Sequence, residues 1–548
     1  MDFLQLKTKL PSAKADFVEI RQSNYIYVDK TKYIYDMTCS TDPIFISRPR
    51  RFGKSTLIST FEELFTHGVK PYDGHDSYFK GLYIEDKWTD EKDYLIMKLD
   101  FAELFTDYCS TGLEFENRFV QVLNDFAKQF GITPKENAKV SDAFSNILKN
   151  VAIKSLVILI DEYDFPLTQN INHPDVFEDI AKSLRSFYQS MKSNSGKYRF
   201  VFITGITRYK DTAIFTAGNT IEDVSLYTEY GEIVGYTKDE IRHYFADYLK
   251  YSASVRKSKA IEQLTKDDVE DLLNELASMY DGYCFDKRCM THVYSTWSII
   301  SFFKNRFAEF ENYWYVNGGL PSVLQSYISD VKDLAQDILK SNLVTVDIST
   351  FLNPTNLDTM DIRVLLYQTG YLTLDKTDAD TFYLKFPNQE IIDSFKTLYF
   401  GRVFNDTNKR SVLKSCKIDT LTTSRDIVDY FNRILNAVDY EHYPLTQESA
   451  VTNSLFMFFN GYSLTYTNVN VHSSKGRADL IIDDSKRRIV CELKYAKESD
   501  NAEVLLKEAC AQIAIREYGE TEPQPQDILK LALVFSEKER KFTLYKEC

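Results

Sequence analysis

The stretch PIFISRPRRFGKSTLISTFEELF, residues 43–65, decides the fold of the N-terminal part of the chain. Its apolar start predicts a buried strand and its basic centre a loop. The residues after Gly53 predict an amphipathic helix, because apolar side chains recur there at helical spacing. A strand, a loop and a helix in this order form the setting of a phosphate-binding loop. Main-chain N–H groups at such a helix N-terminus face the anion, and the helix dipole favours negative charge there.

Four consecutive residues at the start of this helix are candidate nucleotide contacts: Gly53, Lys54, Ser55 and Thr56. We expect Lys54 to reach the β- and γ-phosphates of ATP and the Ser55 hydroxyl to bind Mg²⁺. The alternative interpretation is an ordinary helix start with a solvated lysine.

The loop before Gly53 departs from the usual phosphate-loop pattern, because Arg48 occupies the position of the first glycine. The loop is strongly basic instead of glycine-rich. We expect Arg48, Arg50 and Arg51 to help hold the phosphates, since a guanidinium can bind phosphate through two parallel hydrogen bonds.

Two further buried-strand patterns end in polar residues. The run LVILIDEYDFPL (156–167) contains Asp161 and Glu162, and the run RFVFITGITR (199–208) ends in Arg208. Because the carboxyl ends of parallel strands meet at one edge of a sheet, we expect these residues to lie near the phosphates. Asp161 would bind Mg²⁺ and Glu162 would polarise the attacking water. The alternative is an acidic turn after a core strand.

These strand patterns alternate with helical patterns, which predicts an α/β fold. The apolar runs are continuous, as in parallel strands that are buried on both sides. We therefore predict a parallel sheet with helices on both faces.

The C-terminal stretch KGRADLIIDDSKRRIVCELK (475–494) predicts a β-hairpin. Strand alternation places Glu492 and Lys494 on the same face. With DDSK as the turn, Asp479 falls near Val490 and approaches Glu492 diagonally.

Two carboxylates beside a lysine suit metal-assisted phosphodiester hydrolysis. We expect Asp479 and Glu492 to bind Mg²⁺, with the Leu493 carbonyl as a further ligand. Lys494 would position or activate a water molecule and stabilise charge in the transition state. A surface hairpin with a Glu–Lys pair fits the spacing equally well.

The length of 548 residues allows about three or four domains. We predict an N-terminal domain over 1–235, a mostly helical middle region over 236–420 and a C-terminal α/β domain over 421–548. The middle region includes a helical stretch at 291–328 and, near 362–390, a helix followed by a β-hairpin that resembles a winged-helix element.

The composition limits the partners. A net charge of −14 argues against constitutive coating of nucleic acid, so any such contact is local or gated. No apolar window is long enough to span a membrane, and the cysteine spacing suits free thiols. We therefore expect a cytoplasmic protein with no membrane contact, for which a homo-oligomer is an open alternative to a monomer.

The N-terminal part resembles the bacterial and archaeal AAA-ATPase-like family. The matching strings are FVEIRQSNYIYVDKTKYIYDM (17–37), RPRRFGKST (48–56), LIDEYDFPL (159–167) and TGITR (204–208). Members of that family also carry arginine at the position of Arg48. The resemblance implies a P-loop fold that binds ATP.

The C-terminal part resembles the PD-(D/E)XK nuclease superfamily. GRAD (476–479) and CELK (491–494) match its core strands. Glu448 matches the acidic residue of the first helix, and Gln512 matches the glutamine of the AxxQI helix. The resemblance implies catalytic roles for both residues beside Asp479, Glu492 and Lys494.

Together these patterns predict a protein that binds ATP and hydrolyses it, coupled to Mg²⁺-dependent cleavage of nucleic acid, with DNA as the expected substrate. One alternative is a nucleotide-dependent switch or scaffold whose nuclease fold only binds DNA or a partner. Another is a nuclease whose ATPase fold is vestigial.

Overall fold

The fold is known from a computed structural model of the chain. It describes residues 8–12, 16–40, 42–105, 109–208, 221–316, 324, 343–353, 360–395, 418, 421–440, 443–462, 479–483, 487–516 and 527–548. The chain forms two compact units, Met1–Ile391 and Ile392–Cys548. The boundaries expected at residues 235 and 420 remain predictions.

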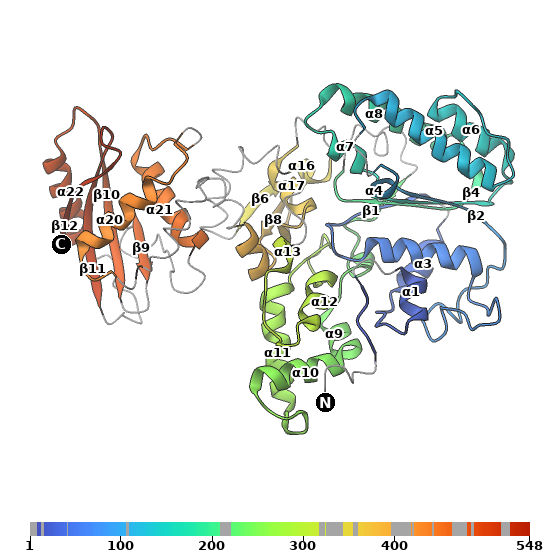
Figure 1. The fold of residues 1–548 in the computed structure, drawn as a ribbon, viewed down its shortest axis with the longest axis horizontal. Helices are drawn as coiled ribbons and strands as arrows, with labels where there is room; N and C mark the ends of the chain where they lie inside the picture. The colour runs from blue at the N-terminus through green and yellow to red at the C-terminus, as the bar shows by residue number, and fades with distance from the viewer. Residues whose placement is uncertain are drawn as a thin grey trace. The chain divides into compact units, whose positions relative to one another are not determined.

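A five-stranded sheet forms the centre of the N-terminal part of the first unit (Figure 1). In spatial order its strands are β2 (Leu95–Asp100), β3 (Leu156–Asp161), β4 (Tyr198–Gly205), β1 (Ile44–Ser47) and β5 (Glu222–Asp223). Every neighbouring pair is parallel, which confirms the predicted parallel sheet. Because β4 lies between β1 and β3, the segments that follow all three strands meet at one edge of the sheet.

Helices cover both faces of this sheet, as predicted (Figure 1). One face carries α1 (Phe17–Gln22) and α3 (Lys54–His67), and the other carries α5 (Gly112–Gln129), α6 (Val140–Asn150) and α8 (Pro174–Lys192). Helix α3 buries Leu57, Phe61 and Leu64, which recur at helical spacing. Three shorter helices are α2 (Thr31–Thr38), α4 (Phe101–Leu104) and α7 (Phe165–Gln169).

The region after the sheet is helical. It contains α9 (Lys238–Tyr244), α10 (Ala246–Lys257), α11 (Lys266–Tyr280), α12 (Thr296–Lys304) and α13 (Tyr313–Val316). These helices share one apolar core that includes Phe245, Leu273, Ile299 and Phe302.

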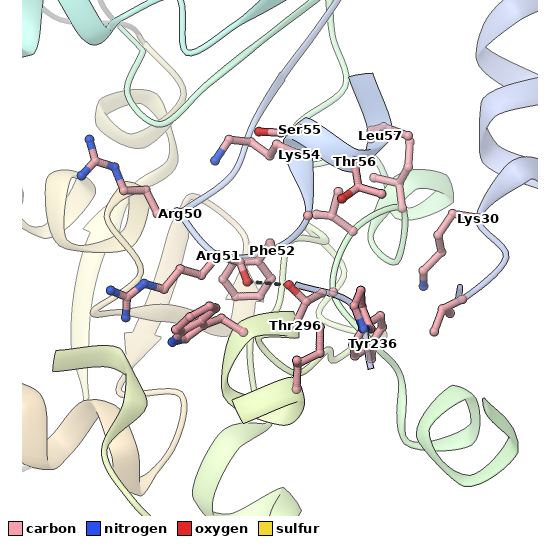
Figure 2. A pocket seen from close by; sticks show the side chains of 18 of the residues that line it. Lys30, Arg50, Arg51, Phe52, Lys54, Ser55, Thr56, Leu57, Tyr236 and Thr296 are labelled. Carbon is pink, nitrogen blue, oxygen red and sulfur yellow. Dashed lines mark hydrogen bonds between the residues drawn. The ribbon is translucent and has the colours of Figure 1, made fainter. Parts of the chain in front are cut away.

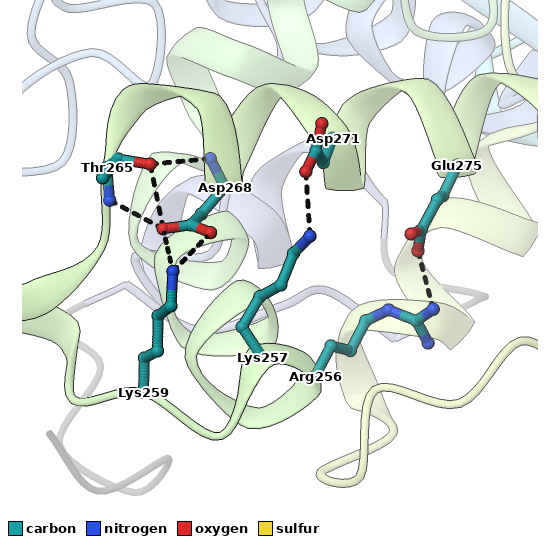
Figure 3. A network of polar contacts seen from close by, with 7 residues as sticks. All are labelled: Arg256, Lys257, Lys259, Thr265, Asp268, Asp271 and Glu275. Carbon is teal, nitrogen blue, oxygen red and sulfur yellow. Dashed lines mark hydrogen bonds and ion pairs between the residues drawn. The ribbon is translucent and has the colours of Figure 1, made fainter.

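Ion pairs join α10 and the residues after it to α11 (Figure 3). Lys257 pairs with Asp271 at 2.8 Å, and Arg256 pairs with Glu275 at 2.6 Å. Lys259 pairs with Asp268, which also closes a capping box with Thr265 at the start of α11. These contacts fix the direction in which the two helices pack.

The stretch 291–328 was predicted to be helical, and this prediction was wrong for residues 291–295 and 305–312. Helix α12 ends at Lys304 because Asn305 is extended, with φ −75° and ψ 106°, and its side chain accepts the main-chain N–H of Phe307. Ala308 then adopts a left-handed conformation with φ 52°, which a continuous helix excludes.

The helix and hairpin expected near 362–390 are present as α17 (Ile362–Gln368), β7 (Thr373–Asp378) and β8 (Thr381–Lys385). The sequence did not indicate β6 (Val344–Asp347), which pairs antiparallel with β8, or α16 (Ile348–Leu352).

The second unit is built on a mixed four-stranded sheet. Its spatial order is β12 (Lys541–Glu547), β11 (Ile528–Ser536), β10 (Arg488–Ala496) and β9 (Leu480–Asp483). Only β10 and β11 are parallel. The unit also contains α20 (Ser424–Leu435), α21 (Glu448–Tyr462) and α22 (Ala502–Arg516). The strand predicted near 463–472 lies outside the described residues.

Helix α22 packs on the sheet through Ala509 and Ile513, which contact Val490 of β10 and Ala532 of β11. This contact identifies the face of β10 that carries Val490, Glu492 and Lys494. None of the helices in the described parts of either unit has the length and apolar character needed to cross a membrane.

Candidate functional sites

The loop between β1 and α3 has the backbone geometry of an anion-binding turn. Gly53 caps α3 with φ 93°, and Arg51 is also left-handed with φ 73°. A positive φ at these two positions turns successive N–H groups toward the helix N-terminus, where an anion is favoured. Ser55, in the first turn of α3, donates its hydroxyl to Oδ2 of Asp161 at 2.7 Å. The structure therefore brings together the two residues predicted to bind Mg²⁺.

Lys54 is buried, and its ammonium donates to the carbonyls of Arg48 and Pro49 at 3.0 and 2.9 Å. Burial lowers the pKa of Lys54, and the carboxylates of Glu162 and Asp161 oppose that shift. Lys54 thus rests against the main chain of the loop, next to the two acidic groups at the end of β3.

Both acidic residues at the end of β3 lie close to the loop. Burial raises the pKa of Asp161, and the charge of Lys54 and the hydrogen bond from Ser55 oppose the rise. Burial also raises the pKa of Glu162, against the charges of Lys54 and Arg50. Glu162 has φ 48° and lines the pocket beside the loop.

Arg48 does not occupy the position that we predicted for it. Its side chain is buried, and its guanidinium donates to the carbonyls of Ser47, Ser225 and Tyr230 while lying over the ring of Phe285. Three of its N–H groups are engaged by these carbonyls, and Arg48 is not among the residues that line the pocket beside the loop. The expected phosphate contact of Arg48 is therefore corrected to a structural one.

The other two loop arginines differ from each other. Arg51 lines the pocket, but its guanidinium donates to the carbonyls of Tyr313, at 2.9 Å, and Trp314. Arg50 lines the pocket as well, and its charge acts on Lys54 and Glu162. Arg50 is thus the loop arginine placed best for a phosphate.

The end of β4 is held by a residue that the sequence did not single out. Asp164 accepts the N–H groups of Ile206 and Thr207 at 3.2 and 2.8 Å and also the Thr207 hydroxyl. Arg208, predicted to lie near the phosphates, pairs with Asp223 of β5 at 2.6 Å and is not among the residues that line the pocket. Its partner on the edge strand accounts for this placement.

A pocket of about 490 Å³ lies beside the loop, within the first unit. Figure 2 shows Arg50 and Arg51 on one side of it, Lys30 and Tyr236 on the other, and Lys54 and Ser55 above. Apolar side chains also line the pocket, among them Ile26, Val28 and Ile300.

Several polar residues of the pocket were missed by the sequence prediction, among them Lys30, Thr296 and Trp297. Lys30 pairs with Glu240 at 2.6 Å, and Thr296 donates its hydroxyl to the Arg51 carbonyl at 2.8 Å (Figure 2). Trp297 has a buried indole N–H with no acceptor among the described residues. The YVDK string, which contains Lys30, contributes only to the family resemblance, and the sequence of α12 has no nucleotide-binding pattern. Only the fold could therefore show that Lys30, Thr296 and Trp297 line the same pocket.

In the second unit the hairpin register differs from the predicted one. Asp483 pairs with Arg488 and Leu480 with Cys491, whereas the predicted register would pair Leu480 with Ile489. This shift of two in the pairing places Asp479 opposite Glu492 instead of Val490. Asp479 accepts the N–H of Leu493 through Oδ2 at 2.7 Å.

One cluster contains the Lys494 ammonium and the carboxylates of Glu492, Glu448 and Asp479. The Lys494 ammonium lies 3.5 Å from Glu492 and 3.9 Å from Glu448, and it donates to the Leu493 carbonyl at 3.1 Å. Burial raises the pKa of Glu448, with the charge of Lys494 opposing and that of Asp479 adding to the rise. All four predicted ionisable residues thus act on one another.

Gln512 lies on α22, one residue before Ile513, which packs on the same face of β10 as Glu492. Its Oε1 is buried and has no hydrogen-bond donor in the described part of the chain. Within the described residues, no group of three or more His, Cys, Asp or Glu side chains is arranged to hold a metal ion. A metal centre here would use Asp479, Glu492 and the Leu493 carbonyl, a hard oxygen set of the kind that Mg²⁺ prefers.

Comparisons with known proteins match the two regions of the chain that contain these candidate sites. Residues 11–215 match the family model described as a predicted AAA-ATPase, and residues 447–543 match that of the PD-(D/E)XK nuclease superfamily. A relative from Azotobacter chroococcum mcd 1, named as an uncharacterized protein in the vnfD 5' region, is 26% identical over 403 residues. The match covers 70% of this chain and 68% of that relative.

The two matched regions contain the phosphate loop with its acidic partner and the hairpin with its carboxylates. The chain therefore has one region similar to the predicted AAA-ATPase family, over residues 11–215, and a C-terminal region similar to the PD-(D/E)XK nuclease superfamily, over residues 447–543.

Proposed function

We propose that the first unit binds and hydrolyses ATP with Mg²⁺, and that the second unit cleaves phosphodiester bonds of DNA with Mg²⁺ under control of the nucleotide. The contact between Ser55 and Asp161 is the observation that carries the nucleotide part. The cluster of Asp479, Glu492 and Lys494 carries the nuclease part.

The pocket fits a nucleotide in its polarity. At one end, the N-terminus of α3 and Arg50 offer N–H groups and positive charge for phosphates. The apolar side chains that line the pocket can take a flat base, and the indole N–H of Trp297 supplies a donor that needs an acceptor. Ser55 and Asp161 would hold Mg²⁺, which offsets phosphate charge when bound.

Glu162 is the residue we assign to the hydrolytic step. It lines the pocket next to Lys54, and its raised pKa makes it a stronger base than a solvated carboxylate. In this role Glu162 accepts a hydrogen bond from the attacking water, while Arg50 and Lys54 hold the phosphate oxygens.

In the second unit, Asp479, Glu492 and the Leu493 carbonyl would hold Mg²⁺, which lowers the pKa of bound water and offsets charge on the scissile phosphate. Lys494 would orient the attacking water and donate to a phosphate oxygen. Glu448 keeps the Lys494 ammonium in place, and the Oε1 of Gln512 can accept a hydrogen bond from a ligand.

Control by nucleotide requires that ATP favours one conformation of the chain over another. The net charge of −14 agrees with such control, because a strongly acidic protein holds nucleic acid only through a local basic site.

The direct experiment measures cleavage of DNA with Mg²⁺ by the wild-type chain and by Glu492→Gln. The matched control is Glu498→Gln, which removes a carboxylate of the same unit that pairs with Lys538 on the surface. We expect cleavage by wild type and control and none by Glu492→Gln. Equal cleavage by all three proteins would remove the proposed nuclease site.

A second candidate function is a nucleotide-dependent scaffold whose nuclease fold only binds DNA or a partner. One observation favours it: the Lys494 ammonium already contacts Glu492, Glu448 and the Leu493 carbonyl, so it offsets part of the negative charge of the cluster without a metal. This function predicts DNA binding by wild type with no cleavage in Mg²⁺ or Mn²⁺, and nucleotide binding that Lys54→Ala abolishes.

A further inference from the structure

Glu390 is a fully buried carboxylate of the first unit, and nothing in the sequence patterns pointed to it. Its Oε1 accepts the main-chain N–H of Trp314 at 2.9 Å, and its Oε2 accepts the Ser298 hydroxyl at 2.8 Å. Its own carbonyl accepts the amide of Asn312 at 3.1 Å. A carboxylate held in the interior by neutral donors is costly, so its position calls for a purpose beyond packing.

Arg51 connects this carboxylate to the phosphate loop. Its guanidinium leaves the loop, donates to the carbonyls of Tyr313 and Trp314, and lies over the rings of Trp297 and Trp314. Trp314 therefore receives Arg51 at its carbonyl and binds Glu390 through its N–H. One peptide segment thus lies between the loop arginine and the buried acid.

Helix α12 supplies the second connection. Thr296 in its first turn donates to the Arg51 carbonyl at 2.8 Å, and Ser298, two residues later, donates to Glu390. The contacts close a ring that runs from Arg51 through Thr296, Ser298, Glu390 and Trp314 back to Arg51. The same helix lines the nucleotide pocket with Trp297 and Ile300.

We propose that Glu390 is a positioning residue for the nucleotide site, which holds α12 and Trp314 so that Arg51 keeps the phosphate loop in its binding conformation. The proposal rests on ATP binding at the pocket. It assigns Arg51 to the loop's support instead of to direct phosphate contact.

Two features of the loop show why such support matters. Arg51 has φ 73°, a conformation that a residue with a side chain keeps only when its surroundings hold it there. A loop that is already in its binding conformation also loses less conformational freedom when the ligand binds, which improves affinity.

Burial raises the pKa of Glu390 to about 7, and the hydrogen bonds from Ser298 and Trp314 and the charge of Arg51 oppose this rise. Glutamine at this position has nearly the same shape, but its NH₂ group cannot accept one of the two hydrogen bonds that the carboxylate accepts from Trp314 and Ser298.

The test measures the dissociation constant of a fluorescent ATP analogue with Mg²⁺ for the full-length wild type and Glu390→Gln. The matched control is Asp268→Asn, a buried carboxylate of the same unit that caps α11 and pairs with Lys259 (Figure 3). We expect Glu390→Gln to weaken binding by about tenfold, as for a lost hydrogen bond to a charged group, and Asp268→Asn to leave affinity unchanged.

A double-mutant cycle distinguishes a connected ring from general loosening of the fold. Arg51→Lys should also weaken binding of the ATP analogue. The protein that carries both changes should bind the analogue as tightly as the single variant with the lower affinity, because each change breaks the same ring of hydrogen bonds. Ser298→Ala removes one donor to Glu390 with little loss of packing, and it serves if Glu390→Gln does not fold. We expect it to weaken binding in the same direction.

Unchanged affinity in Glu390→Gln and Ser298→Ala, or fold-losses that multiply in the double variant, would overturn the assignment of Glu390. A wild-type chain that fails to bind the analogue would instead overturn the proposed ATP site, and with it this inference. The two failures are distinguished by the wild-type measurement alone.

Discussion

Replacing Lys54 with alanine should separate the nucleotide effect from the stability of the fold. Lys54 is buried, and burial lowers its pKa, so removing the charge eliminates a cost of folding along with two hydrogen bonds to main-chain carbonyls. These effects oppose each other, and we expect the variant without nucleotide to lie within about 1 kcal/mol of wild type. The response to ATP should change far more.

The expected change in melting temperature follows from the number of residues in the unit that binds ATP. ATP at a hundred times its dissociation constant stabilises the native state by about 2.7 kcal/mol. Unfolding of a unit that spans Met1–Ile391, at about 2.1 cal/mol/K per residue, has an entropy of about 0.8 kcal/mol/K. Mg²⁺-ATP should therefore raise the melting temperature of wild type by about 3 °C.

Scanning calorimetry of the full chain, with and without Mg²⁺-ATP, measures this shift. Lys80→Ala is the control, because Lys80 is exposed and pairs with Asp76 on the surface. We expect the shift in wild type and Lys80→Ala and its loss in Lys54→Ala. A full shift in Lys54→Ala would refute the view that this lysine holds the phosphates.

Three further predictions follow from the buried acids and the helix cap. Glu492→Gln should lower Mg²⁺-dependent cleavage by more than about a hundredfold, against no change in Glu498→Gln, as measured by product formation on a labelled duplex. Asp161→Asn should raise the melting temperature without nucleotide at pH 7.5, because burial raises the pKa of Asp161 and the charged form opposes folding. That advantage should shrink as the pH falls through the raised pKa and the wild-type acid becomes protonated; an advantage that grows toward acid pH would contradict the cause given. Thr265→Ala should cost about 1 kcal/mol in urea unfolding, since it removes the capping box of α11, and a cost near zero would contradict that role.

The sequence was informative about side-chain positions that a single strand or helix determines. Buried-strand patterns that end in polar residues placed Ser55 and Asp161 at one sheet edge, and their hydroxyl and carboxylate are hydrogen-bonded. In the second unit, strand alternation placed Glu492 and Lys494 on one face, and the two lie 3.5 Å apart. These predictions needed only the periodicity of a strand and the polarity of its end.

The sequence did not predict side-chain positions that depend on contacts with residues distant in the chain. The direction of Arg48 is set by carbonyls of Ser225 and Tyr230, and no local pattern shows that these lie beside the loop. The predicted register of Asp479 was wrong by two residues, because the sequence pattern alone does not determine which residues of β9 and β10 pair. Trp297 was missed because the pocket wall is completed by a helix about 240 residues after the loop.

The unusual arginine-rich sequence of the loop between β1 and α3 can be explained by how the conformational freedom of the loop is limited. A glycine-rich loop reaches left-handed conformations easily but loses much conformational freedom when it binds. Here Gly53 keeps that freedom at the helix cap, while Pro49 and the buried Arg48 fix the start of the loop. Arg51 fixes the centre through Trp314 and Glu390. In the proposed site the main-chain N–H groups at the helix N-terminus, Lys54 and Arg50 hold the anion, so Arg48 and Arg51 are free to act as supports. A loop held in this way binds phosphate well only while its supports are in place, which makes affinity sensitive to the helical region that provides them.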